Sequence, residues 1–318
     1  MRILITGGSG FIGSVLAPLL RGQGHEVVIY DKAAPATEFS LNADVRDLEA
    51  LKVAAQGMDV IYNLAAEHRD DVRPLSLYEE VNVGGARNVM DAAEHAGVKT
   101  VIFTSSVAVY GDSDNPLDES APHNWINDYG RTKSLAEVEH RKWADADPSR
   151  KLVMVRPSVV FGPGNRGNVY NLLKQIAGGR FVMIGAGQNR KSMAFVDNVA
   201  AFLAFTLTLP AGVSIYNYAD KPDFDMNALV SLIRERMGRG HGVGPRLPLW
   251  AAHLAGGGAD LLATMTGKSL PISRVRVRKF VANTEVDASR AHASGFQRPV
   301  DLGDGLAATL DAEFSAAA

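Results

Sequence analysis

The stretch MRILITGGSGFIG (residues 1–13) places an apolar strand, residues 3–5, directly before glycines at positions 7, 10 and 13. Apolar residues at helical spacing follow the last glycine. A dinucleotide pyrophosphate binds at a helix N-terminus only where the backbone of the turn can come close to it. The order of strand, turn and helix around Gly7, Gly10 and Gly13 therefore indicates a dinucleotide-binding turn in an α/β fold.

The end of the next strand indicates which dinucleotide binds. In GHEVVIYDK (residues 24–32) the apolar run 27–30 leads to Asp31. A carboxylate at this place accepts hydrogen bonds from the adenosine ribose hydroxyls and repels a 2′-phosphate. Asp31 therefore favours NAD over NADP, although the adjacent Lys32 softens that preference.

A tyrosine and a lysine stand at helical spacing later in the chain. Tyr129 and Lys133 are four residues apart in DYGRTKSLAEVE (residues 128–139), so they share one face of a predicted helix. Tyrosine ionises near pH ~10, and it becomes a base near neutrality only when positive charge stabilises the phenolate. Lys133 and an oxidised nicotinamide would supply that charge. We therefore expect redox chemistry at an alcohol carbon.

Three more apolar runs, at residues 59–63, 100–104 and 152–156, are each followed by small or polar residues. Buried parallel strands end in this way at the carboxyl edge of a sheet, where ligands bind. Ser106 follows the second run, and we expect its hydroxyl to hold the substrate oxygen beside Tyr129. Thr104 and Ser105 are weaker candidates for the same role.

Taken together, these motifs resemble those of the extended short-chain dehydrogenase/reductases, in the nucleotide-sugar epimerase and dehydratase branch typified by UDP-galactose 4-epimerase. The resemblance covers nearly the whole chain and rests on TGGSGFIG, Asp31, DVRD (44–47), NLAA (63–66), VNVGGARNV (81–89), TSSVAVYG, YGRTK and RPSVVFGPGN. It implies NAD as the cofactor and a homodimer formed through helices near residues 80–96 and 129–143. The expected catalytic residues are Ser106, Tyr129 and Lys133. The expected cofactor-binding residues are Gly7, Gly10, Phe11, Ile12, Gly13, Asp31, Asp44, Val45, Leu64, Ala65, Ala66, Tyr129, Lys133 and Pro157.

By the same resemblance the second half of the chain binds the substrate, a nucleotide-diphosphate sugar. A diphosphate needs cationic or amide donors. The expected substrate-binding residues are Ser106, Asn165, Asn168, Lys191 and Arg278. In the family an arginine commonly begins the segment that ends in Val-Asp, whereas KSMAFVDN begins here with Lys191, preceded by Arg190. The diphosphate contact is therefore left open.

The predicted fold is a Rossmann-type doubly wound parallel sheet with a smaller C-terminal substrate-binding lobe. We expect an NAD-binding domain at residues 1–160 and a mixed α/β lobe at 161–318, and leave open that the chain crosses back. Alternation in SRVRVRKF (273–280) predicts a strand, and the apolar stretch 246–268 predicts core packing or a lid in preference to a membrane-surface helix. His68 either touches the nicotinamide or sugar, or is only solvated.

The preferred mechanism has Tyr129, as a phenolate, removing a proton from a sugar hydroxyl while hydride leaves the same carbon for NAD. The resulting 4-keto sugar takes hydride on its other face in a 4-epimerase. If the ketone leaves, or arrives from another enzyme, the protein is a dehydrogenase or 4-ketoreductase. A 4,6-dehydratase is disfavoured, because the dehydratases that the chain resembles have Asp-Glu after the active-site hydroxyl, and Val107 and Ala108 follow Ser106 here. A decarboxylase, a steroid-type dehydrogenase and a non-catalytic NAD-binding scaffold remain as alternatives.

Composition agrees with an enzyme that acts on small molecules. The 318 residues suffice for a large core, and a net charge of −2 gives no sign of a nucleic-acid partner. The chain has no cysteine, and residues 2–4 lead straight into a strand, so we expect neither disulfides nor a signal peptide. These features predict a cytoplasmic protein without a membrane partner.

Overall fold

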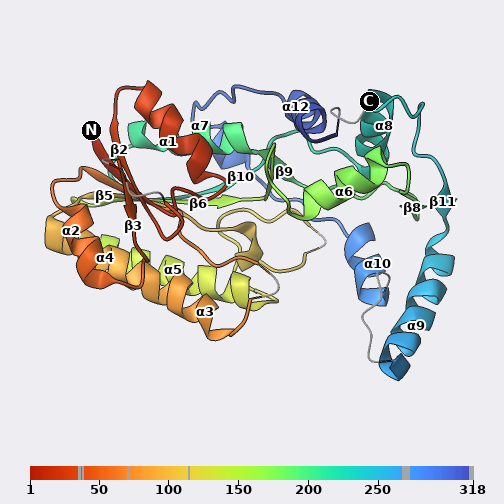
Figure 1. Cartoon of the computed structure of the whole chain (residues 1–318), viewed down its shortest axis with the longest axis horizontal. Helices are drawn as coiled ribbons and strands as arrows, with labels where there is room; N and C mark the ends of the chain where they lie inside the picture. The colour runs from red at the N-terminus through yellow and green to blue at the C-terminus, as the bar shows by residue number, and fades with distance from the viewer. Residues whose placement is uncertain (35–36, 38, 70–71, 114, 267–272, 315–318) are drawn as a thin grey trace.

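The computed structural model describes residues 1–34, 37, 39–69, 72–113, 115–266 and 273–314 (Figure 1). Its centre is a parallel seven-stranded sheet in the order β10-β6-β5-β4-β1-β2-β3. Read from the other edge, the first six strands have the order of a Rossmann sheet. The strands are β1 (Arg2–Thr6), β2 (Glu26–Asp31), β3 (Ser40–Asn42), β4 (Val60–Asn63), β5 (Thr100–Thr104), β6 (Lys151–Pro157) and β10 (Gly212–Tyr218). The predicted doubly wound fold is confirmed.

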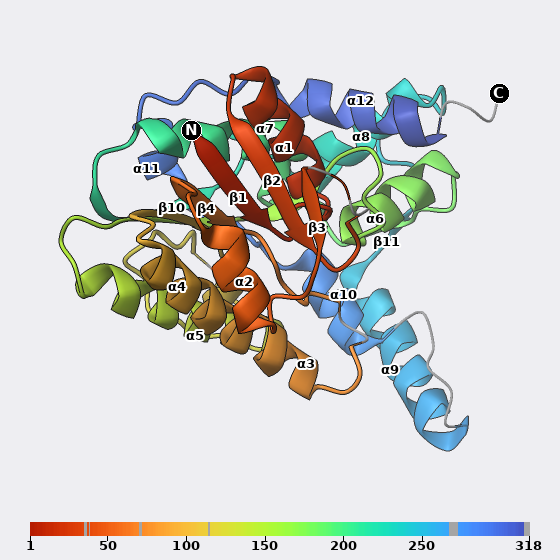
Figure 2. The same cartoon turned by 60° about the vertical axis from the view of Figure 1, so that its left-hand side comes forward.

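Helices cover both faces of this sheet (Figures 1 and 2). On one face lie α1 (Gly13–Gly22) and α7 (Val196–Phe205), and on the other lie α2 (Leu48–Ala55), α4 (Gly85–Ala96) and α5 (Asp128–Asp145). Strand residues alternate between the two layers, so that Ile3 and Ile5 join the first core and Leu4 joins the second. Because both faces are buried, these strands read as continuous apolar runs.

The second lobe has its own core of buried apolar side chains. Its elements are β7 (Val159–Phe161), α6 (Asn168–Ala177), β8 (Met183–Ile184), β9 (Met193–Phe195), α8 (Met226–Arg236), β11 (Arg246–Leu247), α9 (Leu249–Thr266), α10 (Arg274–Val281) and α12 (Leu302–Phe314). Shorter elements are α3 (Ser76–Tyr78), a π-helical turn (Glu79–Gly84), 3-10 turns (Val107–Val109 and Thr206–Thr208) and α11 (Ser289–His292).

After residue 160 the chain returns to the central sheet and to the helices that cover it. β10 pairs with β6 in parallel register, from Gly212 opposite Lys151 to Tyr218 opposite Pro157. α7 packs against α1, and its Phe202 is fully buried. The Phe202 ring lies 4.9 Å from the Tyr218 ring and 5.2 Å from the Phe296 ring, between centroids. Residues on both sides of the expected boundary therefore build one continuous core around the sheet.

One expectation for the second half was wrong. Residues 274–281 form the helix α10 and not a strand: Val277 is buried and Phe280, three residues on, packs against the core of the lobe, while Val275 is 62% exposed. For the apolar stretch that forms α9, core packing or a lid was expected; Trp250 and Leu254 are exposed while Ala252 is buried, and a lid stays a prediction. α9 and α10 project together from the lobe (Figures 1 and 2). Within the described part of the chain, no helix is both long and apolar enough to cross a bilayer.

We expect Phe202→Ala to lower the free energy of unfolding by about 3–5 kcal/mol, because the change leaves a cavity among stacked rings. Urea denaturation followed by circular dichroism measures it. Val53→Ala, at a position that is 75% exposed, serves as the control and should change the value by no more than about 0.5 kcal/mol. A loss below about 1 kcal/mol for Phe202→Ala would mean that α7 and β10 do not share a core.

Candidate active site

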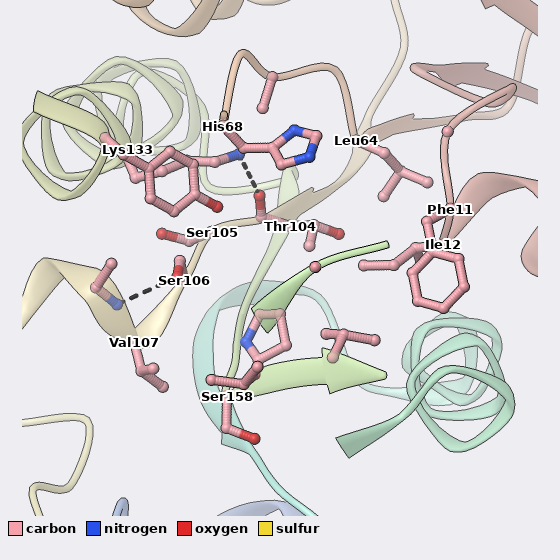
Figure 3. Close-up of a pocket in the computed structure, with 18 of the residues that line it drawn as sticks. Phe11, Ile12, Leu64, His68, Thr104, Ser105, Ser106, Val107, Lys133 and Ser158 are labelled. Carbon is pink, nitrogen blue, oxygen red and sulfur yellow. Dashed lines mark hydrogen bonds between the residues drawn. The ribbon is translucent and has the colours of Figure 1, made fainter. Parts of the chain in front are cut away.

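A cavity of about 990 Å³ opens at the carboxyl ends of the parallel strands, where this fold binds its ligands (Figure 3). All the residues expected to bind the cofactor line it, as do Ser106, Asn165 and Asn168. Lys191 and Arg278 are not among the lining residues. The sheet edge therefore gathers side chains from five strands and from the start of α5 into one site.

The glycine turn leaves room where a pyrophosphate would approach. Gly7 has φ +72°, and a Cβ there would lie 2.6 Å from the backbone nitrogen of Ala65. A Cβ on Gly13 would lie 2.6 Å from the Cα of Gly8, so this glycine lets α1 start against the turn. A Cβ on Gly10 would meet only the Gly7 carbonyl oxygen, at 3.1 Å. Gly10 therefore presents bare backbone to the cavity.

Asp31 lies at the end of β2, on the adenosine side of the expected cofactor groove. Its carboxylate accepts hydrogen bonds from the backbone N–H of Ser9 at 3.0 Å and of Ala33 at 2.8 Å. These two bonds fix the carboxylate at the rim of the cavity, where ribose hydroxyls can reach it. Asp44 lies nearby, and hydrogen bonds from Arg46 hold the pKa of its carboxyl below the usual range.

The inner end of the cavity is lined by hydroxyls without partners. Among the described residues, the hydroxyl oxygens of Thr104, Ser105 and Ser158 are buried and make no hydrogen bond. All three residues line the cavity (Figure 3). Buried polar groups in native proteins are almost always paired, so these groups fit a polar ligand. Together with the bare glycine turn and Asp31, they fit NAD with its nicotinamide end here.

Lys133 extends from α5 to the end of β5 and is 2% exposed. Its ammonium donates to the carbonyl oxygen of Thr104 at 2.7 Å and lies 4.8 Å from the centre of the Phe103 ring (Figure 3). Burial lowers the pKa of Lys133 to about 7, and the carboxylate of Glu137 opposes part of that shift. Without a bound cofactor, the protein therefore only partly stabilises the charged form of Lys133.

Tyr129, at the start of α5, and Ser106, just after β5, both line the cavity and share a hydrogen bond. Burial raises the pKa of the Tyr129 phenol, a hydrogen bond with Ser106 lowers it in part, and nearby Tyr78 raises it. The Ser106 oxygen also accepts the backbone N–H of Ala108 at 3.1 Å, which fixes the hydroxyl at the start of a 3-10 turn. Without further positive charge, Tyr129 is a neutral phenol at pH 7.

A buried ion pair lies behind Lys133 and was not recognised in the sequence. Arg156 on β6 donates to Glu137 on α5 at 2.6 and 2.8 Å, and both side chains are nearly fully buried. Arg156 also donates to the Tyr110 hydroxyl and to Nε2 of His123. Glu137 follows Lys133 by one helical turn, a spacing that the sequence shows, but its partner on β6 is visible only in the fold.

A second unrecognised residue, Asn82, holds the loop that follows β4. Its amide oxygen accepts the backbone N–H of Glu67 at 2.7 Å, and its amide nitrogen donates to the Glu67 carbonyl and the Thr132 hydroxyl. This places His68, an exposed residue that lines the cavity, close to the nicotinamide end (Figure 3). The motif around Asn82 was noticed, but nothing in the sequence indicates that its side chain acts as a clamp.

The expected substrate-binding residues fall into two groups. Asn165 and Asn168 line the outer part of the cavity with Arg166, whose guanidinium pairs with Glu313. Lys191 lies beside the cavity wall, where it donates to the carbonyl oxygen of Ala282 at 3.2 Å. Arg278 is exposed on α10. The structure therefore brings Asn165 and Asn168 to the site and leaves Lys191 and Arg278 outside its lining.

The lowered pKa of Lys133 predicts how stability changes with pH in the NAD-free protein. Because the pKa of Lys133 is about 7 in the folded protein and its ordinary value is 10.5, the unfolded chain binds more protons between these values, and stability rises with pH there. Relative to Lys133→Met, the wild-type free energy of unfolding should rise by up to about 1.4 kcal/mol per pH unit.

Urea denaturation at pH 7, 8 and 9 measures this slope. Lys142→Met removes an exposed lysine of the same helix and should keep the wild-type slope. Equal slopes for wild type and Lys133→Met would contradict the shift.

Comparison with known proteins agrees with this geometry. Residues 3–219 match the NAD dependent epimerase/dehydratase family. The N-acetyl-alpha-D-glucosaminyl-diphospho-ditrans,octacis-undecaprenol 4-epimerase of Escherichia coli O157:H7 is 46% identical over 316 residues, which are 98% of this chain and 95% of that protein. The UDP-glucose 4-epimerase of Vibrio cholerae is 28% identical over 83% of this chain and 85% of its own length.

Solved structures show the same fold. MoeE5 in complex with UDP-glucuronic acid and NAD is 25% identical and superposes with a TM-score of 0.75 over 98% of each chain. The UDP-glucose complex of MoeE5 gives a TM-score of 0.77 over the whole of both chains, at 24% identity. The family match covers most of this chain and all the strands that build its cavity. The chain therefore belongs to the NAD-dependent epimerase/dehydratase family, and NAD is its cofactor.

Proposed function

We propose that the protein is an NAD-dependent 4-epimerase of a sugar carried on a diphosphate. The observation that carries this proposal is the meeting of Ser106, Tyr129 and Lys133 at the inner end of the cavity that the glycine turn and Asp31 open. The 46% identity to a 4-epimerase over nearly the whole chain supports it.

When bound, NAD accepts the hydride from carbon 4 of the sugar, returns it, and adds positive charge beside the phenol. The protein supplies the proton chemistry. Lys133, one helical turn from Tyr129, would in its charged form favour the Tyr129 phenolate, which takes the proton of the 4-hydroxyl. The Ser106 hydroxyl, fixed by its bond from Ala108, shares a hydrogen bond with the Tyr129 phenol and would hold the sugar oxygen in line with it.

Epimerisation also requires the 4-keto sugar to turn and present its other face. The cavity volume of about 990 Å³ leaves room for this motion beside a bound dinucleotide. Asn165 and Asn168 line the cavity, and this position supports them as contacts of the diphosphate. Lys191 and Arg278 stay proposals that require the substrate to extend beyond the cavity.

The carrier of the diphosphate has two candidates. A nucleoside, as the resemblance implied, is supported by the UDP-glucose 4-epimerase relative. A polyprenol is supported by the more similar relative, whose name specifies an undecaprenol-linked sugar. The homodimer and the cytoplasmic location remain predictions.

The deciding experiment analyses the cofactor released from denatured protein and then incubates the enzyme with UDP-sugars and with polyprenyl-diphosphate sugars. Retained NAD and interconversion of the 4-epimers without net NADH is the expected result. Stoichiometric NADH formed or consumed only when NAD(H) is added would replace the epimerase with a dehydrogenase or ketoreductase. Which panel turns over identifies the carrier.

Tyr129→Phe should lower kcat by about 10²–10⁴-fold because it removes the proton acceptor, while NAD stays bound. Turnover of the sugar accepted by the wild type and the NAD content of the purified variant measure this. Tyr170→Phe, a tyrosine outside the cavity lining, is the matched control and should keep full activity. Retained activity in Tyr129→Phe would contradict the mechanism.

Asp31→Asn should weaken NAD binding about tenfold and reduce the ratio of the affinity for NAD to that for NADP. The change removes a carboxylate that accepts hydrogen bonds from the ribose hydroxyls and repels a 2′-phosphate. Calorimetric titration of the NAD-free protein with both dinucleotides tests this. Asp91→Asn changes an exposed carboxylate of α4 and should leave both affinities unchanged. An unchanged affinity ratio in Asp31→Asn would show that this carboxylate does not select the cofactor.

A further inference from the structure

The projecting pair of helices α9 and α10, here named the α9–α10 hairpin, exposes large apolar side chains. Trp250 is 69% exposed and Leu254 is 66% exposed, and the two lie one turn apart on one face of α9. Val275 on α10 is 62% exposed and Leu249 is 38% exposed. Soluble domains seldom gather such residues on one projecting element unless another surface covers them.

The same segment is strongly basic within an otherwise balanced chain. Residues 245–282 contain six lysine and arginine residues and one acidic residue, whereas the whole chain has a net charge of −2. Arg274 and Arg278 are exposed and lie one turn apart on α10. Here the tryptophan and leucine lie on α9 and the exposed arginines on the adjoining α10, and apolar and basic side chains together are what binds the interface of an anionic bilayer.

The hairpin is joined directly to the wall of the active site. α10 ends at Val281, and the next residues of the chain, 283–286, line the cavity. This wall is fixed to the lobe, because Asn283 accepts the backbone N–H of Arg190 at 2.8 Å and Thr284 pairs with Lys191. A surface that the hairpin touches is therefore held beside the mouth of the cavity.

We propose that the α9–α10 hairpin docks on the surface of an anionic phospholipid bilayer through Trp250 and Leu254, with its arginines facing the lipid phosphates. The proposal rests on the proposed function in its polyprenol form, since a sugar on a lipid carrier reaches the cavity only from a membrane. The enzyme then lies on the bilayer without crossing it. The sequence alone favoured core packing or a lid, and the exposure of Trp250 and Leu254 is what changes that interpretation.

The test is flotation of the purified full-length protein with vesicles, without any substrate. Wild type should float with phosphatidylcholine vesicles that contain about 30% phosphatidylglycerol, and about tenfold less with phosphatidylcholine alone or in high salt. The double variant Trp250→Glu/Leu254→Glu should lose about tenfold in vesicle binding, because it removes the apolar contact. Val53→Glu/Val182→Glu changes two other exposed apolar residues and is expected to float like wild type.

Circular dichroism and NAD content show whether each variant is folded. Failure of the wild type to float, or equal flotation of Trp250→Glu/Leu254→Glu, would overturn the proposal. Light scattering tests the alternative that a second copy of the chain covers this face. In that case the wild type would be a dimer that does not float, and Trp250→Glu/Leu254→Glu would be a monomer.

Flotation does not depend on catalysis, so the two proposals fail separately. Tyr129→Phe should float like wild type and be inactive. Vesicle binding by a wild type that epimerises no diphosphate-linked sugar would support docking and refute the function. If Trp250→Glu/Leu254→Glu loses activity only toward polyprenyl substrate that is bound to vesicles, the result would support both proposals.

Discussion

The ion pair between Arg156 and Glu137 is the contact on which the geometry of the site depends. It joins β6 to α5 in the interior, one helical turn from Lys133, and Arg156 reaches on to Tyr110, which follows Ser106 in the chain. Tyr110 in turn donates to Asn217 of β10, so the strand that crosses back is tied to the same group. Removing one partner of a buried pair typically costs about 3–5 kcal/mol, which makes the arrangement costly to disturb. The three expected catalytic residues thus lie in front of an ion pair, Arg156 with Glu137, that does not itself line the cavity.

The electrostatics of the cavity follow from that arrangement. Lys133 is surrounded by backbone and an aromatic ring, with Glu137 as its nearest countercharge, and burial lowers its pKa. Tyr129, also buried, has its pKa raised. Each pKa shift favours the neutral form of its group, so in the NAD-free protein both the Lys133 amine and the Tyr129 phenol are shifted toward their uncharged forms. A cofactor that brings positive charge to this end therefore changes the acid-base state of the site as well as its redox capacity.

Much of the central sheet and its cofactor site could be predicted from the sequence, because the motifs that indicate them are local. The glycine turn, Asp31 after β2, and the spacing of Tyr129 and Lys133 each lie within a few residues, and the cavity gathers all the residues predicted for the cofactor. The role of Arg156 could not be predicted, because its partner is nineteen residues away and the pairing needs the docking of α5 on the sheet.

The second half was harder to predict for a different reason. In residues 274–281 valine and arginine alternate as in a strand, but the side chains that are withdrawn from solvent are three residues apart: Val277 is buried, and Phe280 packs against the core of the second lobe. A period of two and a period of three and a half both fit so short a run, and packing decides between them. The return of the chain through β10 likewise depends on contacts with β6, which no local pattern in GVSIYNY reveals.

The exposure of Trp250 has a spectroscopic consequence. The chain has three tryptophans, and of these Trp143 is 4% exposed while Trp125 and Trp250 are 45% and 69% exposed. Trp143 also lies under the guanidinium of Arg150, 4.8 Å from it. Indole emission shifts to shorter wavelength when the ring leaves water, and Trp250 is the tryptophan with the largest exposed fraction. The protein therefore carries its own fluorophore near the start of α9.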